Sequence, residues 1–203
     1  YTPLDIYQLC DIRARIMREH SIGDPYDKVK REESEAALAN LPTVLAAIDG
    51  CETDDTVETL LRAILAGNKF DLGAKDTTDQ HRNEGIDFFK TLGELPPRPW
   101  FADDVDAIKE KLAPGRVGYR KAIFFVDNAG GDVLLGAIPI ARYLADQGCR
   151  VVLAANDEPS LNDITNWELH DVLAAAAGHH DERLVDHLRK GTISVVGSGC
   201  DCP

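Results

Sequence analysis

The spacing of hydrophobic residues changes at about residue 120 of this 203-residue chain. Before that point apolar residues recur every three or four positions, which is typical of amphipathic helices. This spacing predicts helices over residues 4–20, 26–48, 56–66 and 102–112. Pro42 lies inside the second of these stretches and is expected to kink or restart the helix.

Short continuous apolar runs replace this pattern in the rest of the chain. Residues 122–126, 150–155 and 192–196 have the length and content of strands that are buried on both faces. Helical patterns over residues 133–145 and 161–177 separate them. The order strand, helix, strand, helix, strand predicts a Rossmann-like, doubly wound parallel sheet, so the fold class is α/β.

The two patterns divide the chain into a helical subdomain, residues 1–115, and the first part of an α/β domain, residues 116–203. The last residues read as a strand that runs into a turn and then stops. A three-stranded sheet ending there would leave an edge strand bare. We therefore expect the sheet to be truncated at its C-terminus and to be completed beyond Pro203 or by a partner chain.

Charge and hydropathy narrow the choice of partners. Lysine and arginine total 22 against 35 aspartate and glutamate residues, which gives a net charge of −13. So acidic a chain is poorly suited to nucleic acids or anionic membranes, and no apolar run reaches the roughly 20 residues that span a bilayer. The five cysteines are scattered, which argues against a disulfide framework. These features favour a cytoplasmic protein with neither nucleic-acid nor membrane partners.

Polar residues follow the first two predicted strands. Asp127 and Asn128 end the first strand, the Gly130-Gly131 turn comes next, and a polar cluster over residues 156–163 follows the second strand. Open α/β sheets bind ligands beyond the carboxyl ends of their strands. The glycines let backbone amides approach a ligand, and the next helix can offer its N-terminus to an anion. This edge of the sheet is therefore a candidate phosphate site.

A divalent cation fits the same edge. Asp163 is expected to open the second helix and to face Asp127 and Asn128 across the crevice. Two carboxylates and an amide oxygen suit Mg²⁺ or Mn²⁺ and, with open positions, Co²⁺ or Ni²⁺. Aspartate and asparagine are also common helix N-caps, so spacing alone leaves plain capping open. Asp132 and Asp157 are interpreted as caps or surface residues.

Both clusters resemble the signatures of the metal-dependent damage-control phosphatases, the family of domain of unknown function 89. The matching stretches are residues 126–136 and 155–165. The N-terminal half is similar to the subfamily that is fused to pantothenate-kinase-like domains. That similarity lies in Leu9–Arg13, Asp24–Tyr26, Glu35–Leu38, Ala66–Lys75 and Arg98–Trp100.

The resemblance implies a divalent-metal-dependent hydrolase of small phosphomonoesters. Its substrate would be 4′-phosphopantetheine or its damaged forms, with sugar phosphates as further candidates, which suggests a role in coenzyme A metabolism and metabolite damage control. The family's metal ligands and catalytic residues map onto Asp127, Asn128 and Asp163. The expected substrate-binding residues are Gly130, Gly131, Asn156, Asn68 and Asp71.

Two points stay open at this stage. The family completes its pocket with a Glu-Gly-Met-Gly-Arg stretch and a lysine, and neither occurs before Pro203, which puts the activity of these 203 residues alone in doubt. The attacking group could be a water molecule or the Asp127 carboxylate.

Two other classes of function compete with the phosphatase. A dinucleotide-dependent oxidoreductase would suit the doubly wound pattern, but the chain has no G-x-G-x-x-G fingerprint. A non-catalytic regulatory or interaction module of a pantothenate-kinase-like protein would explain the incomplete pocket.

Overall fold

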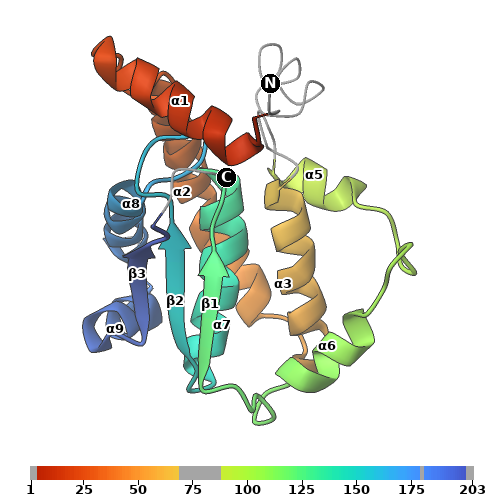
Figure 1. The fold of residues 1–203 in the computed structure, drawn as a ribbon. Helices are drawn as coiled ribbons and strands as arrows, with labels where there is room; N and C mark the ends of the chain where they lie inside the picture. The colour runs from red at the N-terminus through yellow and green to blue at the C-terminus, as the bar shows by residue number, and fades with distance from the viewer. Residues whose placement is uncertain (1–3, 69–87, 179–180, 200–203) are drawn as a thin grey trace.

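The computed structural model describes residues 4–68, 88–178 and 181–199. Helices form the N-terminal part, and a small sheet with its own helices forms the rest (Figure 1). None of the helices in these ranges has the length and hydrophobicity needed to cross a membrane. The helices that precede the sheet are α1 (Ile6–Glu19), α2 (Asp27–Asp49), α3 (Thr53–Asn68), α5 (Phe88–Glu94) and α6 (Val105–Leu112).

The sheet consists of three parallel strands in the order β1-β2-β3. Its strands are β1 (Lys121–Phe125), β2 (Arg150–Ala155) and β3 (Ile193–Gly197). The first crossover contains η1 (Asp132–Ala137) and α7 (Ile138–Asp146), and the second contains α8 (Asn166–Gly178) and α9 (Glu182–Lys190). The predicted α/β class with a parallel sheet is confirmed. The division at residue 115 stays a prediction.

The helices of both crossovers lie on one side of the sheet. Parallel crossovers are right-handed, so two steps in the same direction place their helices on the same face. Val151 and Leu153 are fully buried on that face, whereas Ile123 is 56% and Phe125 73% exposed on the other. No described element covers that second face in Figure 1. Our prediction that the first strand is buried on both faces is therefore wrong for the described part of the chain.

Two prolines lie within helical stretches and are accommodated differently. α2 runs through Pro42 as one helix, so the predicted restart does not occur. Pro139 lies in the first turn of α7, directly after η1, which is π-helical and ends with a hydrogen bond from the N–H of Ile138 to the carbonyl oxygen of Val133. Such π-helical turns are rare and occur frequently at functional sites.

One apolar cluster joins the N-terminal helices to the sheet. It contains residues of α2 and α3 as well as residues of η1, α7 and the strands. Its largest fully buried members include Leu41, Leu60, Leu134, Ile138 and Leu153. The N-terminal helices are therefore packed against the elements that carry the polar strand ends.

Arg98 organises the segment between α5 and α6. Its Nε donates to both oxygens of Asp103 at 2.8 and 3.0 Å, and its Nη1 donates to Glu58 on α3 at 3.2 Å. The hydrogen bonds from Arg98 lower the pKa of Asp103 to about 2. Nη1 of Arg98 also donates to Asp106 on α6 at 3.0 Å. The Arg98–Trp100 stretch, which carried part of the family resemblance, therefore connects α3 to α6.

An Asp103→Asn variant is expected to lower the melting temperature at pH 7. A carboxyl group with a depressed folded pKa stabilises the fold above its unfolded value, 3.8, and this contribution is lost as pH falls through about 2. The difference in melting temperature between the variant and the natural protein should therefore shrink between pH 4 and pH 2. Circular dichroism melts at several pH values would measure it, and a difference that stays constant would contradict this account.

Candidate metal and phosphate site

The loops that follow β1 and β2 lie side by side and are joined by backbone contacts. Asn128 and Asp163 form an isolated antiparallel bridge. The N–H of Ile164 donates to the carbonyl oxygen of Asp127 at 2.8 Å. Because β1 and β2 are neighbouring parallel strands, their carboxyl ends meet at one edge of the sheet. The structure thus brings the backbones of Asp127, Asn128 and Asp163 together.

The loop after β2 is held in place by its own polar residues. Asn156 pairs with Thr165 in a parallel bridge and accepts a backbone hydrogen bond from Asn166 at 2.8 Å. Its side-chain Nδ2 donates to Oδ2 of Asp163 at 2.9 Å. Asp163 therefore lies in this loop, three residues before α8 begins, and our prediction that it opens the helix is wrong.

The predicted ligands differ in exposure. Asn128 and Asp163 are each 3% exposed, whereas Asp127 is exposed to solvent. Burying a carboxylate is costly unless hydrogen bonds or a cation compensate its charge. The N–H from Asn156 supplies part of that compensation for Asp163. This arrangement resembles a cation site that is open on the Asp127 side.

The amide of Asn128 tests whether these residues fit a cation. Its Oδ1 accepts from Nδ2 of Asn162 at 2.8 Å, while its own Nδ2 is buried without a hydrogen-bond partner among the described residues. The oxygen and nitrogen ends of such amides are interchangeable by rotation. Turning both amides keeps their mutual hydrogen bond and places the Asn128 oxygen where the unpartnered nitrogen now lies. In that form the oxygen donors of Asp127, Asn128 and Asp163 are of the kind that a divalent cation prefers, and their shared binding of one cation stays a prediction.

The proposed set of cation ligands has only two carboxylates, so it needs the amide oxygen of Asn128 as its third ligand. Nowhere in the described ranges do three or more His, Cys, Asp and Glu side chains gather in a metal-binding arrangement. The Cys200 and Cys202 pair lies outside those ranges. The carboxylate–amide set at the strand ends is therefore the metal-site candidate that the geometry supports.

The glycine turn after Asn128 packs tightly against α2. Gly130 has φ +76°, and a Cβ built on it would lie 2.8 Å from Cβ of Glu33. The backbone N–H of Asn128 donates to Oδ2 of Asp132 at 3.3 Å, and Asp132 is the first residue of η1 and not its N-cap. Only a residue without a Cβ fits this approach, which explains the glycine at position 130. Gly131 is the N-cap of η1.

The C-terminal end of α3 contacts the same turn. A Cβ on Gly67 would lie 2.9 Å from both Cα of Asp132 and the carbonyl oxygen of Gly131. The predicted binding residue Asn68 is the exposed last residue of α3, directly beside this contact. The predicted Asp71 lies outside the described residues.

Sequence reasoning missed two basic residues that reach the second loop. Lys30 on α2 is 2% exposed and donates to the carbonyl oxygen of Asp163 at 3.2 Å. Arg13 on α1 approaches the hydroxyl of Ser160 at 3.5 Å. The sequence spacing could have predicted that Lys30 is buried, because Lys30 lies on the same face of the helix as the buried Ala37 and Leu41.

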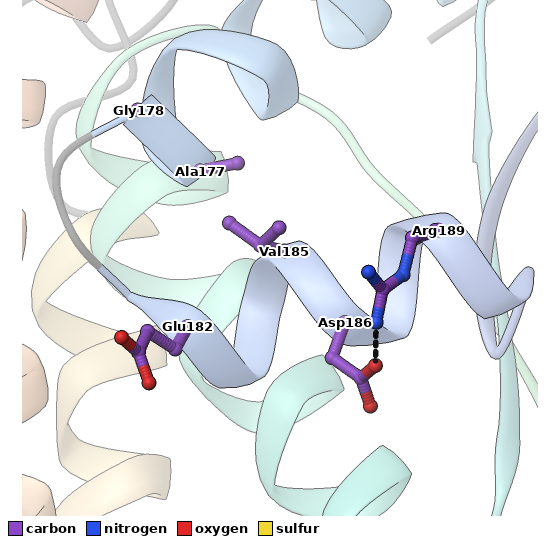
Figure 2. A pocket seen from close by; sticks show the side chains of 6 residues that line it. All are labelled: Ala177, Gly178, Glu182, Val185, Asp186 and Arg189. Atoms are coloured by element: carbon purple, nitrogen blue, oxygen red, sulfur yellow. Dashed lines mark hydrogen bonds and ion pairs between the residues drawn. The ribbon is translucent and has the colours of Figure 1, made fainter.

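A shallow pocket elsewhere carries no comparable chemistry. It has a volume of about 440 Å³, lies between the end of α8 and α9, and is lined by Ala177, Gly178, Glu182, Val185, Asp186 and Arg189 (Figure 2). Arg189 is paired with Asp186 at 2.8 Å, as the dashed line shows. None of the predicted site residues lines it. We therefore place the candidate site at the strand ends.

Comparison with known proteins decides the family. The model of the family described as "Damage-control phosphatase ARMT1-like domain" matches residues 2–203. The chain belongs to this family. The family resemblance expected from the two strand-end signatures is thereby confirmed.

Three curated relatives match nearly the whole chain. A damage-control phosphatase of Arabidopsis thaliana is 38% identical over 99% of the chain, which covers 54% of that protein. Pantothenate kinase 2 of the same plant is 39% identical over 89% of the chain but is covered over only 21% of its own length. The mouse (Mus musculus) 4′-phosphopantetheine phosphatase is 31% identical over the full chain, which covers 24% of it. The chain thus spans about half, or less, of these relatives.

A solved structure supports the fold. A DUF89 family protein of Pyrococcus horikoshii has a TM-score of 0.58 at 16% sequence identity, over 93% of this chain and 55% of that one. The match agrees with an α/β architecture in this damage-control phosphatase domain.

Proposed function

We propose that this protein hydrolyses small phosphomonoesters with the help of a divalent cation held by Asp127, Asn128 and Asp163. The observation that carries the proposal is the bridge between Asn128 and Asp163, which sets a buried amide beside a buried carboxylate at the strand ends. Family membership supports the same reaction class. Mn²⁺, Co²⁺, Ni²⁺ and Mg²⁺ are the cations that this oxygen-rich donor set suits.

The turn at Gly130 and Gly131 would bind the phosphate group. Backbone N–H groups at the start of a helix bind anions, and η1 begins at Asp132, directly after this turn. With a net charge of −13 the chain repels a phosphate at long range, so local N–H donors must orient it. A cation at the site would polarise a phosphoryl oxygen and activate a water. Asn156 would act by holding the Asp163 carboxylate in place.

The proposed substrate is 4′-phosphopantetheine or one of its damaged forms, with sugar phosphates as further candidates. The support is the similarity to a mouse protein named 4′-phosphopantetheine phosphatase. The similarity to plant pantothenate kinase 2 proteins supports a fused or associated pantothenate-kinase-like domain as partner and a role in coenzyme A metabolism.

Attack on phosphorus could come from water or from the exposed Asp127 carboxylate. If Asp127 attacks, the ester oxygen leaves with the alcohol and an aspartyl phosphate forms, which water then hydrolyses. Rapid quenching of the reaction followed by mass spectrometry would find a phosphate on Asp127 in that case. Direct attack by water would leave Asp127 unmodified at every time point.

A non-catalytic module is the second candidate. The chain covers only 20% to 21% of the two plant pantothenate kinase 2 proteins, so it is a small part of larger chains there. This alternative predicts weak or absent cation binding and no release of phosphate.

The deciding experiment measures phosphate release from 4′-phosphopantetheine by the full-length protein. It compares EDTA with Mg²⁺, Mn²⁺, Co²⁺ and Ni²⁺, and natural protein with Asp127→Ala. Asp186→Ala on α9 is the matched control, because it removes the same side chain at an exposed ion pair. We expect cation-dependent release that Asp127→Ala abolishes and Asp186→Ala retains. Absence of release with every cation would reject this activity on this substrate and favour the non-catalytic module.

A further inference from the structure

A lysine is buried where α2 faces the second site loop. Lys30 is 2% exposed, although lysine is among the residues least often buried. It occupies a stripe of α2 that continues through Ser34, Ala37 and Leu41 toward the apolar core. A charge at such a position needs partners that fix it.

The ammonium group of Lys30 has three partners from three parts of the chain. It is 2.5 Å from Oδ2 of Asp24, in the turn before α2. It is 2.8 Å from Glu168, in the first turn of α8. It also donates to the backbone carbonyl of Asp163 at 3.2 Å. The contacts to Glu168 and to the carbonyl oxygen of Asp163 are hydrogen bonds, and the contact to Asp24 is an ion pair.

Glu168 completes a clamp on the loop that carries Asp163. Its Oε2 accepts from the backbone N–H of Thr165 at 2.8 Å and from the Thr165 hydroxyl at 2.6 Å. Lys30 therefore holds residue 163 directly and residue 165 through Glu168. Asp163 thus contacts the strand ends through Asn128 and Asn156 and the Lys30 cluster through its own carbonyl oxygen.

We propose that Lys30 is a positioning residue that fixes the Asp163 carboxylate for cation binding. It acts through the backbone of residue 163 and does not touch the substrate. Asp24 and Glu168 balance its charge and leave a net charge of −1, so the cluster does not repel a cation at the adjacent loop.

The proposal rests on the proposed function for its cation site, but its test is separable from activity. Loss of a residue that supports a metal ligand typically costs 10- to 100-fold in metal affinity. Lys30→Met should therefore raise the dissociation constant for Mn²⁺, measured by calorimetry, by about 10- to 100-fold. In phosphate release, the Mn²⁺ concentration for half-activity should rise equally, while KM for the ester at saturating Mn²⁺ stays unchanged.

Two further variants separate positioning from general destabilisation. Lys28→Met is the matched control on the same helix, because Lys28 is 81% exposed and pairs only with Glu32 among the contacts described for it. It should leave Mn²⁺ affinity unchanged. The double variant Lys30→Met, Glu168→Gln removes the unpaired charge of Glu168 and should fold even if the single variant does not. Its Mn²⁺ affinity should stay at least 10-fold weakened, because the donor to residue 163 is still missing.

Hydrogen exchange of the cation-free protein adds a readout that needs no activity. The amides of residues 163–165 should exchange faster in the Lys30 variants, while those of β2 remain protected.

Mn²⁺ affinity within twofold of the natural protein in a folded Lys30→Met variant would overturn the proposal. Full recovery of affinity in the double variant would overturn it too, since charge balance alone would then explain the effect. Failure of phosphate release in the natural protein, with Mn²⁺ binding intact, would reject the proposed function and leave the positioning role standing.

Discussion

Asp163→Asn is expected to lower the affinity for Mn²⁺ by more than 100-fold and to abolish phosphate release. The change preserves the size of the side chain, and asparagine can still accept the hydrogen bond from Asn156, so the loop should keep its shape. It removes one of the two carboxylate charges that the proposed cation needs. The loss should exceed the 10- to 100-fold typical of residues that only support a ligand.

Thermal melts give a readout of Asp163→Asn that does not depend on the substrate. A ligand at about 100 times its dissociation constant stabilises a fold by about 2.7 kcal/mol, which is about 5–10 °C for a chain of this size. Mn²⁺ should produce this rise in the natural protein and none in the variant. Asp157→Asn is the matched control, because Asp157 accepts hydrogen bonds from Asn166 at 2.6 Å and Gly199 at 2.8 Å and should have a structural role. If the Mn²⁺ response survives in Asp163→Asn and disappears in Asp157→Asn, the cation binds at Asp157 and the assignment to Asp163 is wrong.

Gly130→Ala should destabilise the fold strongly, although it adds only one methyl group. The left-handed backbone at φ +76° costs an alanine about 1–2 kcal/mol. The new Cβ would also lie 2.8 Å from Cβ of Glu33, and such overpacking costs about 1–3 kcal/mol more. Urea unfolding should therefore show a loss of about 2–5 kcal/mol in the free energy of unfolding. Phosphate release should fall as well, because the turn that follows Asn128 must move.

Gly148→Ala separates the backbone cost of a left-handed alanine from the cost of overpacking. Gly148 has φ +84°, but no heavy atom lies within 4 Å of a Cβ built there. This control should therefore lose only the backbone cost, about 1–2 kcal/mol, and keep its activity. Equal losses in the two variants would show that the turn can move away from α2 without cost.

The position of the strands followed from the sequence alone. Residues 150–155 were predicted as a strand and form β2, and the other two strands agree within one residue at each end. Continuous β-branched and aromatic runs favour extended chain wherever they are buried. The sequence also predicted that Asp127 and Asn128 lie at a strand end, because they come directly after an apolar run.

Local rules gave the wrong structure for the loop before α8. The polar stretch up to Asp163 looked like a helix start, but its backbone and side chains bond to Asn128 and Asn156 on the neighbouring strand ends. Asn128 and Asn156 lie outside the few residues that a helix-start pattern takes into account, so such a pattern cannot reveal these hydrogen bonds. α9 was not predicted either, although its three apolar residues, Leu184, Val185 and Leu188, have helical spacing.

The sequence by itself determined the three strands, most of the helices, the acidic character and the residue types available for a cation, because these depend on local spacing and composition. The tertiary structure alone decided that Lys30 reaches the loop of Asp163, that Glu33 leaves room for nothing larger than glycine at position 130, and that one face of β1 is exposed. Each of these depends on contacts between segments separated by about a hundred residues or on the direction of the crossovers. Such contacts are fixed by packing of the whole chain, and spacing along the sequence does not encode them locally.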